Sequence, residues 1–479
     1  MKKEIYLQKS LDNNVSQITA LFNDELLKVK YITNINNKDL RMAIIYFGHL
    51  VKRDYIHDSI TKPLIEFTFK IEKGLALKTL KESVITASEV VEQTSIDDIA
   101  TDLMMGRTVL LIDKVNTALV METNDRISRT TEEPEPEKIL RGPREGFSES
   151  LLYNISLVRR KILSPNFKFE YFKIGKNTNT HYCICYFVGL VDTQVLDEVK
   201  KRLNRVRPDG IIDSHTIHQA ISEKGYSPFD TIGYTEKPDT FVSKILEGKV
   251  GIIVDGTPVA LTVPQLFVEN FQSSEDYYVS PYFASLSRFS RILGFFTSLF
   301  LPAVYIAVIT HHWEVLPLAL AQALAKAQMG TPFPSIIECF LLLLTFEVLR
   351  ETGVRVPSGV GQSLSVVGAI VIGQAAVEAS LVSPTMVFIV SLTAITGLIN
   401  YKMKGAAIVL RYLNIIIAAL FGLYGCLFAF FGLLVHLFNI RAFGVQYMER
   451  SVPFTLKNIG DSFIRVPMED INTSGSVEK

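Results

Sequence analysis

Residues 292–310 read ILGFFTSLFLPAVYIAVIT, a run without a single charged side chain. Its length is about what a helix needs to cross the hydrocarbon core of a bilayer. Arg288 and Arg291 stand just before it, and positive charges flank membrane helices mainly on the cytoplasmic side. The run therefore predicts a transmembrane helix that separates a soluble first part of the chain from a membrane part.

Charged residues are distributed unevenly on the two sides of this run. The 479 residues include 49 Lys and Arg and 49 Asp and Glu, a balance that argues against a nucleic-acid-binding protein. These charges are dense up to about residue 291 and sparse from there to Arg441. No apolar signal-peptide core follows the first residues, MKKEIYLQKSLDNN, so we expect the soluble part in the cytoplasm.

Further apolar runs predict an all-α polytopic membrane domain over residues 281–440, with about 4–6 membrane segments and a C-terminal tail at 441–479. Lys402, Lys404 and Arg411 indicate a cytoplasmic loop before the last run, whereas Arg441 and Arg450 indicate a cytoplasmic tail after it. The charges thus leave the topology open. The runs lie at roughly 316–327, 336–349, 364–382, 385–400 and 413–438.

The soluble part contains a faint internal repeat. The sequence GRTVLLIDKVNTALV from Gly106 resembles GKVGIIVDGTPVALTV from Gly248, and each predicts a β-hairpin. The strand-like segments IIYFGHLV, with Tyr46, and ICYFVGLV, with Tyr186, precede the two glycines at a similar spacing. The expected fold is α+β: two similar α/β subdomains in tandem, at 1–130 and 148–280, joined by a proline-rich acidic linker at 131–147.

No catalytic arrangement is evident in the soluble part. His215 and His218 could lie near one another on a helix, but two histidines without a third ligand are a weak metal signal. The four cysteines show no CxxC spacing and are expected to be reduced and structural. We expect no enzymatic activity, no cofactor and no metal site.

Residues 360–384, VGQSLSVVGAIVIGQAAVEASLVSP, carry polar side chains inside an apolar run. At helical spacing, small and weakly polar residues fall on one stripe, and Gln374 and Glu378 fall on another. Such a stripe suits close helix packing or the wall of a narrow pore, and Glu378 could also lie in water at the interface. The stripe comprises Gln362, Ser365, Ala369, Gly373, Ala376 and Ser380.

The run 336–349, IIECFLLLLTFEVL, carries Glu338 and Glu347 and is short for a membrane span. One interpretation is a helix at the membrane interface, with both carboxylates in water or paired to Arg350 and Arg355. The other is a half-buried helix with a role in gating or coupling. Three prolines bracket the run, at Pro332, Pro334 and Pro357.

Several strings together resemble the A-subunit family of spore germinant receptors, the GerA type of endospore-forming bacteria. They include EEPEPEKILRGPREGFSESLLYNISLVRRKI, KPDTFVSKILEGKVGIIVDGTPVALTVPQLF followed by SSEDYY, TPFPSIIECFLLLLTFEVLRETGVRVP, and VGAIVIGQAAVEASLVSP. The resemblance extends in order from about residue 100 to 468. The first hundred residues match only in general layout.

The resemblance implies a multispan protein of the spore inner membrane with its N-terminal domain on the core side. It also implies a permease-like B subunit and a lipoprotein C subunit as partners. Assembly into a ring, with a pentamer suspected, would form a nutrient-gated cation channel. A related A-subunit-like protein that acts with the dipicolinic-acid channel shares most of these motifs, and a non-conducting membrane scaffold is the alternative of a different class.

Overall fold

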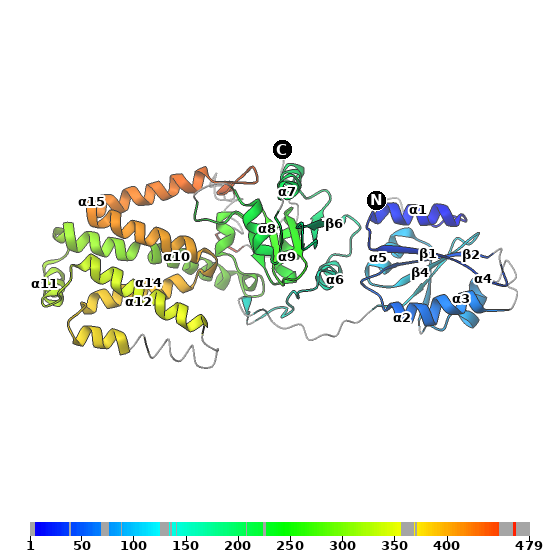
Figure 1. Ribbon diagram of the computed structural model, residues 1–479, viewed down its shortest axis with the longest axis horizontal. Coiled ribbons are helices and arrows are strands. Elements are labelled where there is room, and N and C mark those ends of the chain that lie inside the picture. The colour runs from blue at the N-terminus through cyan, green and yellow to red at the C-terminus, as the bar shows by residue number, and fades with distance from the viewer. Residues whose placement is uncertain are drawn as a thin grey trace. The chain divides into compact units, whose positions relative to one another are not determined.

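The computed structural model describes residues 5–37, 40–68, 76–87, 89–124, 134, 137–139, 141–206, 208–223, 227–355, 368, 371–449 and 463–465. These residues form two compact units. The first contains the described residues up to Ser222 and the segment Ile232–Pro264. The second contains the described residues of Glu223–Thr231 and those from Gln265 onward. Sheets with covering helices make up the first unit, and helices dominate the second (Figure 1).

The first sheet of the first unit is antiparallel and has the strand order β1-β2-β4-β5-β3. Its central strands are apolar on both faces, so each face requires a cover of helices. The elements are α1 (Leu11–Phe22), β1 (Leu27–Thr33), β2 (Arg41–Phe47), α2 (Arg53–Ile56), η1 (His57–Thr61), α3 (Lys62–Glu66), α4 (Ala76–Thr79), η2 (Leu80–Val84), β3 (Val90–Gln93), α5 (Ile96–Met104), β4 (Thr108–Ile112) and β5 (Ala118–Met121).

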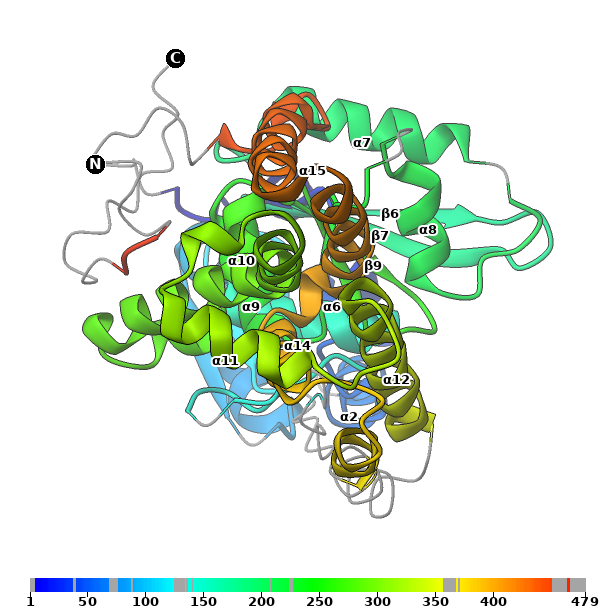
Figure 2. The same cartoon turned by 90° about the vertical axis from the view of Figure 1, so that its left-hand side faces the viewer.

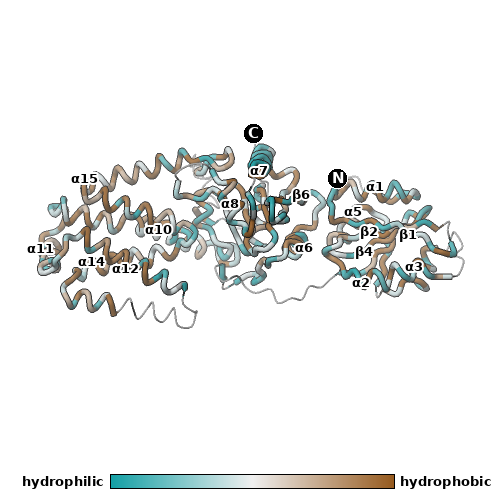
Figure 3. The backbone as a smooth tube through the Cα atoms, in the orientation of Figure 1, coloured by the Kyte–Doolittle hydropathy of each residue, from teal (hydrophilic) through white to brown (hydrophobic). Residues whose placement is uncertain are grey.

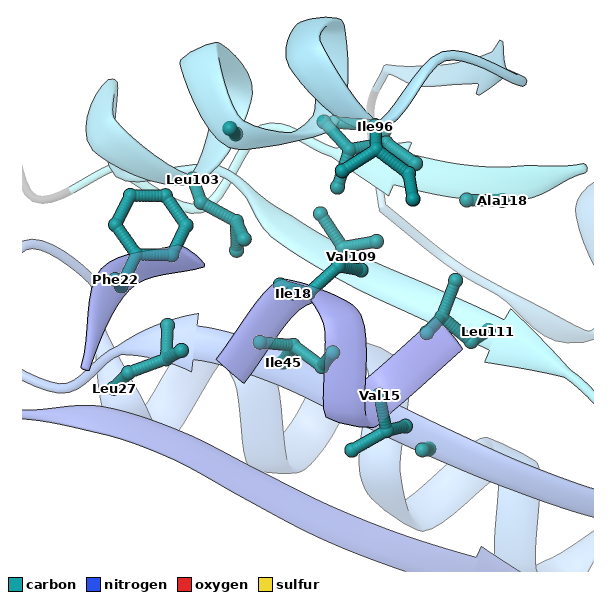
Figure 4. Close-up of a cluster of buried hydrophobic side chains, with 14 of the residues drawn as sticks. Val15, Ile18, Phe22, Leu27, Ile45, Ile96, Leu103, Val109, Leu111 and Ala118 are labelled. Atoms are coloured by element: carbon teal, nitrogen blue, oxygen red, sulfur yellow. The ribbon is translucent and has the colours of Figure 1, made fainter. Parts of the chain in front are cut away.

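Helices α1 and α5 cover one face of this sheet. In Figure 4, Ile18 and Phe22 of α1 and Leu103 of α5 lie over Val109 and Leu111 of β4. All five side chains are buried. The segment from α2 to η2 supplies the apolar cover of the opposite face. The sheet is therefore the middle layer of a three-layer core.

The second sheet has the strand order β6-β7-β9-β10-β8 and is also antiparallel. Helices α6 and α9 pack on one face through buried side chains such as Ile155, Phe241 and Ile245. The elements are α6 (Leu151–Lys161), β6 (Phe167–Ile174), β7 (Thr180–Phe187), α7 (Thr193–Arg205), α8 (Ser214–Ile221), β8 (Gly233–Thr235), α9 (Pro238–Leu246), β9 (Val250–Val254) and β10 (Ala260–Val263).

The two hairpins predicted from the repeat are confirmed as β4–β5 and β9–β10. Each hairpin carries an aspartate that binds the start of a helix. Asp113 Oδ1 accepts a hydrogen bond from the Leu11 amide over 3.3 Å, and Asp255 Oδ1 accepts one from the Leu151 amide over 2.9 Å. The first amides of a helix lack partners within the helix, so each aspartate stabilises α1 or α6 at its N-terminus.

Gly106 and Gly248 precede these hairpins and both have positive φ, +82° and +91°. A Cβ atom on Gly106 would lie 2.8 Å from the Leu50 carbonyl oxygen, and one on Gly248 would lie 2.6 Å from the Leu190 carbonyl oxygen. Left-handed backbone and close backbone approach both require glycine. This explains why the repeated sequence pattern begins with that residue.

Replacing Gly248 with alanine is expected to lower the free energy of unfolding by about 3 kcal/mol, since it combines left-handed strain with a clash against backbone. Gly189 is a matched control. It has the same φ of +91°, but a Cβ atom there meets nothing within 4 Å. Gly189→Ala should therefore cost only about 1 kcal/mol. Thermal unfolding of the purified variants measures the difference, and equal losses would contradict the clash.

Two helices of the second unit are long and apolar enough to cross a membrane: Pro281–His311, which is α10, and Tyr401–Asn439, which contains α15. The apolar colouring of these helices is visible in Figure 3. The unit's elements are η4 (Phe267–Phe271), η5 (Ser274–Tyr277), α10 (Pro281–His311), η6 (Trp313–Val315), α11 (Leu318–Gln328), α12 (Ser335–Arg355), α14 (Pro384–Leu398), η7 (Tyr401–Met403), α15 (Lys404–Asn439), β11 (Arg441–Ala442) and β12 (Val445–Gln446).

Helix α10 lies beside α15 and α14, and α12 packs on α14 (Figure 2). Small buried residues line these contacts, among them Ala303 and Ala307 of α10 and Ala418 of α15. Small side chains let helix backbones approach closely where hydrophobic burial alone gives no driving force. Large apolar side chains remain exposed on the outer faces, for example Phe388 and Phe428.

Candidate functional site

Polar and ionic side chains gather at three places among the helices of the second unit. The first is the start of α12. Glu338 is fully buried there, and its Oε2 accepts hydrogen bonds from the Ser383 amide over 3.3 Å and from the Ser383 hydroxyl over 3.0 Å. Ser383 caps α14 by accepting from the Met386 amide. The carboxylate of one helix thus binds the N-terminus of another.

The second place joins α12, α15 and α10. Glu347 pairs with Arg350 one turn along α12, and its Oε1 lies 3.9 Å from Arg411 Nη1 of α15. Arg411 is 3% exposed, and its Nε donates to the Ser298 carbonyl of α10 over 2.7 Å. Gly397 of α14 leaves room for the guanidinium, because a Cβ atom there would lie 3.2 Å from Arg411 Nη2. The buried Arg411 guanidinium of α15 therefore lies next to residues of α10, α12 and α14.

The third place is the start of α10. Asp276 of η5 accepts from Arg288 Nε over 3.0 Å and from both terminal nitrogens of Arg291 over 2.8 and 2.9 Å. Arg288 is fully buried, and Asn400 donates to the Arg291 carbonyl over 2.6 Å. Burial acts to raise the pKa of Asp276, but the hydrogen bonds and positive charge of Arg291, followed by the Arg288 hydrogen bond, bring that pKa below its ordinary value.

Helix α15 is interrupted at Gly422, where φ is 61° and ψ is −146°. His312 at the end of α10 fills the space, since a Cβ atom on Gly422 would lie 2.4 Å from its Cε1. The Leu423 amide donates to His312 Nδ1 over 3.5 Å. A break in an apolar helix frees backbone groups that need new partners, and His312 supplies one of them.

Only some of the candidate pore or packing residues belong to the part of the chain that the structure describes. Gln362, Ser365 and Ala369 lie outside the described residues, as does Pro357. Residues 371–378 are helical, with Gly373 and Ala376 partly exposed. Gln374, Glu378 and Ser380 are exposed, and Ser380 has a φ of +56°.

The candidate gating residues are distributed along α12. Pro332 and Pro334 are exposed and immediately precede it. Arg355 is exposed and pairs with Glu351 over 2.7 Å, away from the buried cluster. Glu338 and Glu347, by contrast, face buried partners, so the two carboxylates of the predicted segment have different environments.

Several residues of these clusters differ from the sequence-based expectation or lie outside it. The interpretation of Arg411 as part of a loop is wrong, because α15 already begins at Lys404 and encloses it. Asp276, Arg288 and Asn400 were not singled out as partners. For Arg411, the signal in the sequence was a lone charge within an apolar run, because such a group needs a partner or water.

These clusters join neighbouring helices through buried hydrogen bonds and ionic contacts. His215 and His218 stack at 5.5 Å between ring centroids on α8, and His215 contacts Gln219. In the described part of the chain, no group of three or more His, Cys, Asp or Glu side chains could hold a metal ion. The four cysteines are buried free thiols, and none of them forms a disulfide.

Comparison with known proteins identifies relatives over nearly the whole chain. The family model described as Bacillus/Clostridium GerA spore germination protein matches residues 13–476. Spore germination protein KA of Bacillus subtilis is 38% identical over 97% of this chain and 86% of its own length. Spore germination protein GerLA of Bacillus cereus is 32% identical over 95% of this chain and 94% of its own length.

Two further matches are a membrane protein and a solved domain. The uncharacterized membrane protein YfkQ of Bacillus subtilis is 37% identical over 88% of this chain and 83% of its own length. The N-terminal domain of the A subunit of the Bacillus megaterium spore germinant receptor GerK3 is 28% identical, covering 56% of this chain and 99% of that chain, with a TM-score of 0.44. By its family-model match and by its identity to these relatives, the chain belongs to the GerA family of spore germination proteins.

Proposed function

We propose that this protein is the A subunit of a nutrient germinant receptor and that it assembles into a ligand-gated cation channel that triggers spore germination. The observation that carries the receptor assignment is the 38% identity to spore germination protein KA over 97% of the chain. Relatives named as spore germination proteins match the chain along almost their full length. The permease-like B subunit and the lipoprotein C subunit are the proposed partners.

The channel part of the proposal rests on the second unit. Two helices could cross a membrane by length and composition, and a proposed total of about 4–6 segments includes shorter ones such as α14. The Glu347–Arg350–Arg411 cluster connects α12 to α15, so a shift of α12 would have to break a buried ionic contact. Such a contact favours discrete closed and open arrangements over gradual ones.

The proposed location is the spore inner membrane, with the N-terminal domain on the core side. For that domain we propose two similar subdomains in tandem. The identical strand orders of the two sheets support this, as do two matched asparagine contacts. Asn14 binds the backbone amide and carbonyl of Gln8 at 2.8 and 2.6 Å, and Asn154 binds those of Ser148 at the same distances.

Conductance tests the channel directly. The purified protein, reconstituted in a planar bilayer alone and with its B and C subunits, should pass monovalent cations when the nutrient is added. A non-conducting scaffold would remain silent under all conditions while still binding its partners. This experiment separates the two classes of function that the sequence leaves open.

The protein is expected to form a homo-oligomer through its membrane helices. Large side chains such as Phe388, 65% exposed, and Phe428, 74% exposed, leave apolar faces that suit either lipid or a second copy. Chemical crosslinking in native membranes should give a ladder extending beyond the dimer, up to a pentamer. A strictly monomeric mass in mild detergent, together with no ladder in membranes, would contradict oligomerisation.

Replacing Ala369 with aspartate is expected to open the proposed pore. If Ala369 lines a narrow apolar constriction, a carboxylate hydrates it and removes the barrier to ions. If Ala369 instead packs against a helix, the buried charge lowers the amount of folded protein. Ion leakage from spores, measured beside membrane abundance, distinguishes the two: leakage at normal abundance supports the pore, and low abundance without leakage refutes this assignment.

A further inference from the structure

Glu338 occupies an unusual environment for an acidic side chain. It lies in the first turn of α12 and has no exposed surface. Its Oε2 is bound by the Ser383 amide and hydroxyl. The amide belongs to the N-terminal end of α14, where the helix dipole stabilises negative charge. This end of α14 therefore supplies two hydrogen-bond donors to one oxygen of the Glu338 side chain.

The second oxygen of the same carboxylate has neither a hydrogen-bond donor nor a cation beside it among the described residues. Glu338 Oε1 is buried and has no hydrogen-bond partner there. In those same ranges, no Lys, Arg or His pairs with Glu338, in contrast to Glu347 on the same helix. A buried carboxylate oxygen without a donor or a cation is costly, so the site requires another group.

Further polar side chains lie near this position. The Tyr305 hydroxyl of α10 is also buried, and no hydrogen bond of good geometry reaches it from the described residues. Its polar neighbours are the side chains of Gln328, Ser383 and Thr385, together with the charge of Glu338. Polar side chains of α10, α11, α12 and α14 therefore lie near one another within one protomer.

The geometry points to a binding site for a monovalent inorganic cation, Na⁺ or K⁺, held by Glu338 Oε1, the Tyr305 hydroxyl and the hydroxyls at the start of α14. Hard cations prefer oxygen ligands. Among the described residues, the polar groups at this site are one carboxylate and otherwise neutral side chains. The single negative charge of the carboxylate would balance one monovalent cation. The Ser383 hydroxyl donates to Glu338 and retains a lone pair for a cation.

The proposed site does not depend on the presence of a conduction path. It lies between helices of a single chain, and cation binding there would fasten α12 to α14 and α10. An ordered water could also satisfy Glu338 Oε1, but water would give no dependence on the kind of cation. Dependence on cation identity at constant ionic strength is thus the deciding property.

The test uses the full-length protein in detergent, with chloride salts of Na⁺, K⁺ or N-methylglucamine at equal ionic strength. Thermal unfolding is followed by the fluorescence of Trp313, the single tryptophan of the chain. Saturating Na⁺ or K⁺ should raise the melting temperature by about 2–5 °C over N-methylglucamine, since a ligand that binds only the folded state stabilises it. An equal melting temperature in all three salts would overturn the proposal.

Three variants assign the effect to the site. Glu338→Gln keeps an acceptor for Ser383 but removes the charge, so it should abolish the cation-dependent shift. Tyr305→Phe should raise the half-saturating cation concentration about 10-fold, the equivalent of one lost ligand of about 1.4 kcal/mol. Glu351→Gln, at an exposed position of the same helix, should leave the shift unchanged.

A melting-temperature shift that persists in Glu338→Gln would refute the role of Glu338 as a cation ligand. A larger shift with Mg²⁺ than with either monovalent ion would refute the assignment to a monovalent cation. If Glu338→Gln does not fold, the wild-type salt comparison and Tyr305→Phe still decide. Failure of this test leaves the receptor proposal untouched, because conductance and cation-dependent melting are separate measurements.

Discussion

Replacing Asp276 with asparagine is expected to lower the free energy of unfolding by about 3–5 kcal/mol, because it removes the negative charge that binds the buried Arg288 guanidinium. Asparagine has nearly the same shape, so the loss reports charge and not packing. Thermal unfolding of the full-length protein in detergent measures it. Glu275→Gln is the matched control, because Glu275 is the adjacent, partly exposed acid and should change the melting temperature little.

The same aspartate predicts a pH dependence with a defined sign. Its pKa is lowered in the folded protein, so its contribution to stability is complete above the ordinary aspartate pKa of about 3.9 and is lost as the pH falls through the lower folded pKa. The difference in stability between wild type and Asp276→Asn should be constant from about pH 5 to about pH 7, because this range lies above the ordinary aspartate pKa of about 3.9. It should shrink only below about pH 4. A difference that already shrinks near pH 6 would show that another group is responsible.

Replacing Glu347 with glutamine is expected to destabilise the second unit by about 3–5 kcal/mol, because Arg411 remains buried and loses its nearby negative charge. The control is Glu351→Gln on the same helix. Glu351 pairs with Arg355 where both side chains are largely exposed, and such pairs contribute little. Protein abundance in membranes and the melting temperature should both fall for Glu347→Gln alone.

This prediction also bears on gating. If the Glu347–Arg411 contact holds the proposed channel closed, the variant that remains folded should leak cations in the absence of nutrient. If the contact is purely structural, the loss of abundance should be proportional to the loss of receptor response. Similar effects of Glu347→Gln and Glu351→Gln on melting would contradict the buried cluster itself.

Local pattern was sufficient to predict the hairpins and the onset of the membrane part. The repeated glycine, aliphatic run and aspartate at Gly106 and Gly248 predicted the two hairpins, because alternation and turn chemistry act over a few residues. The uncharged run 292–310 lies within α10, as predicted for a long apolar helix. These features depend on neighbours in sequence, so sequence alone determined them.

The partners of buried charges depended on tertiary structure. Helical spacing placed Glu338 and Glu347 on one segment but could not show that the first binds Ser383 and the second approaches Arg411. Each of these contacts joins helices far apart along the chain. Arg411 illustrates the reason: the same charge near the start of an apolar run suits a loop or a buried helix, and only the packing of α15 against α10 and α12 determines which environment it has.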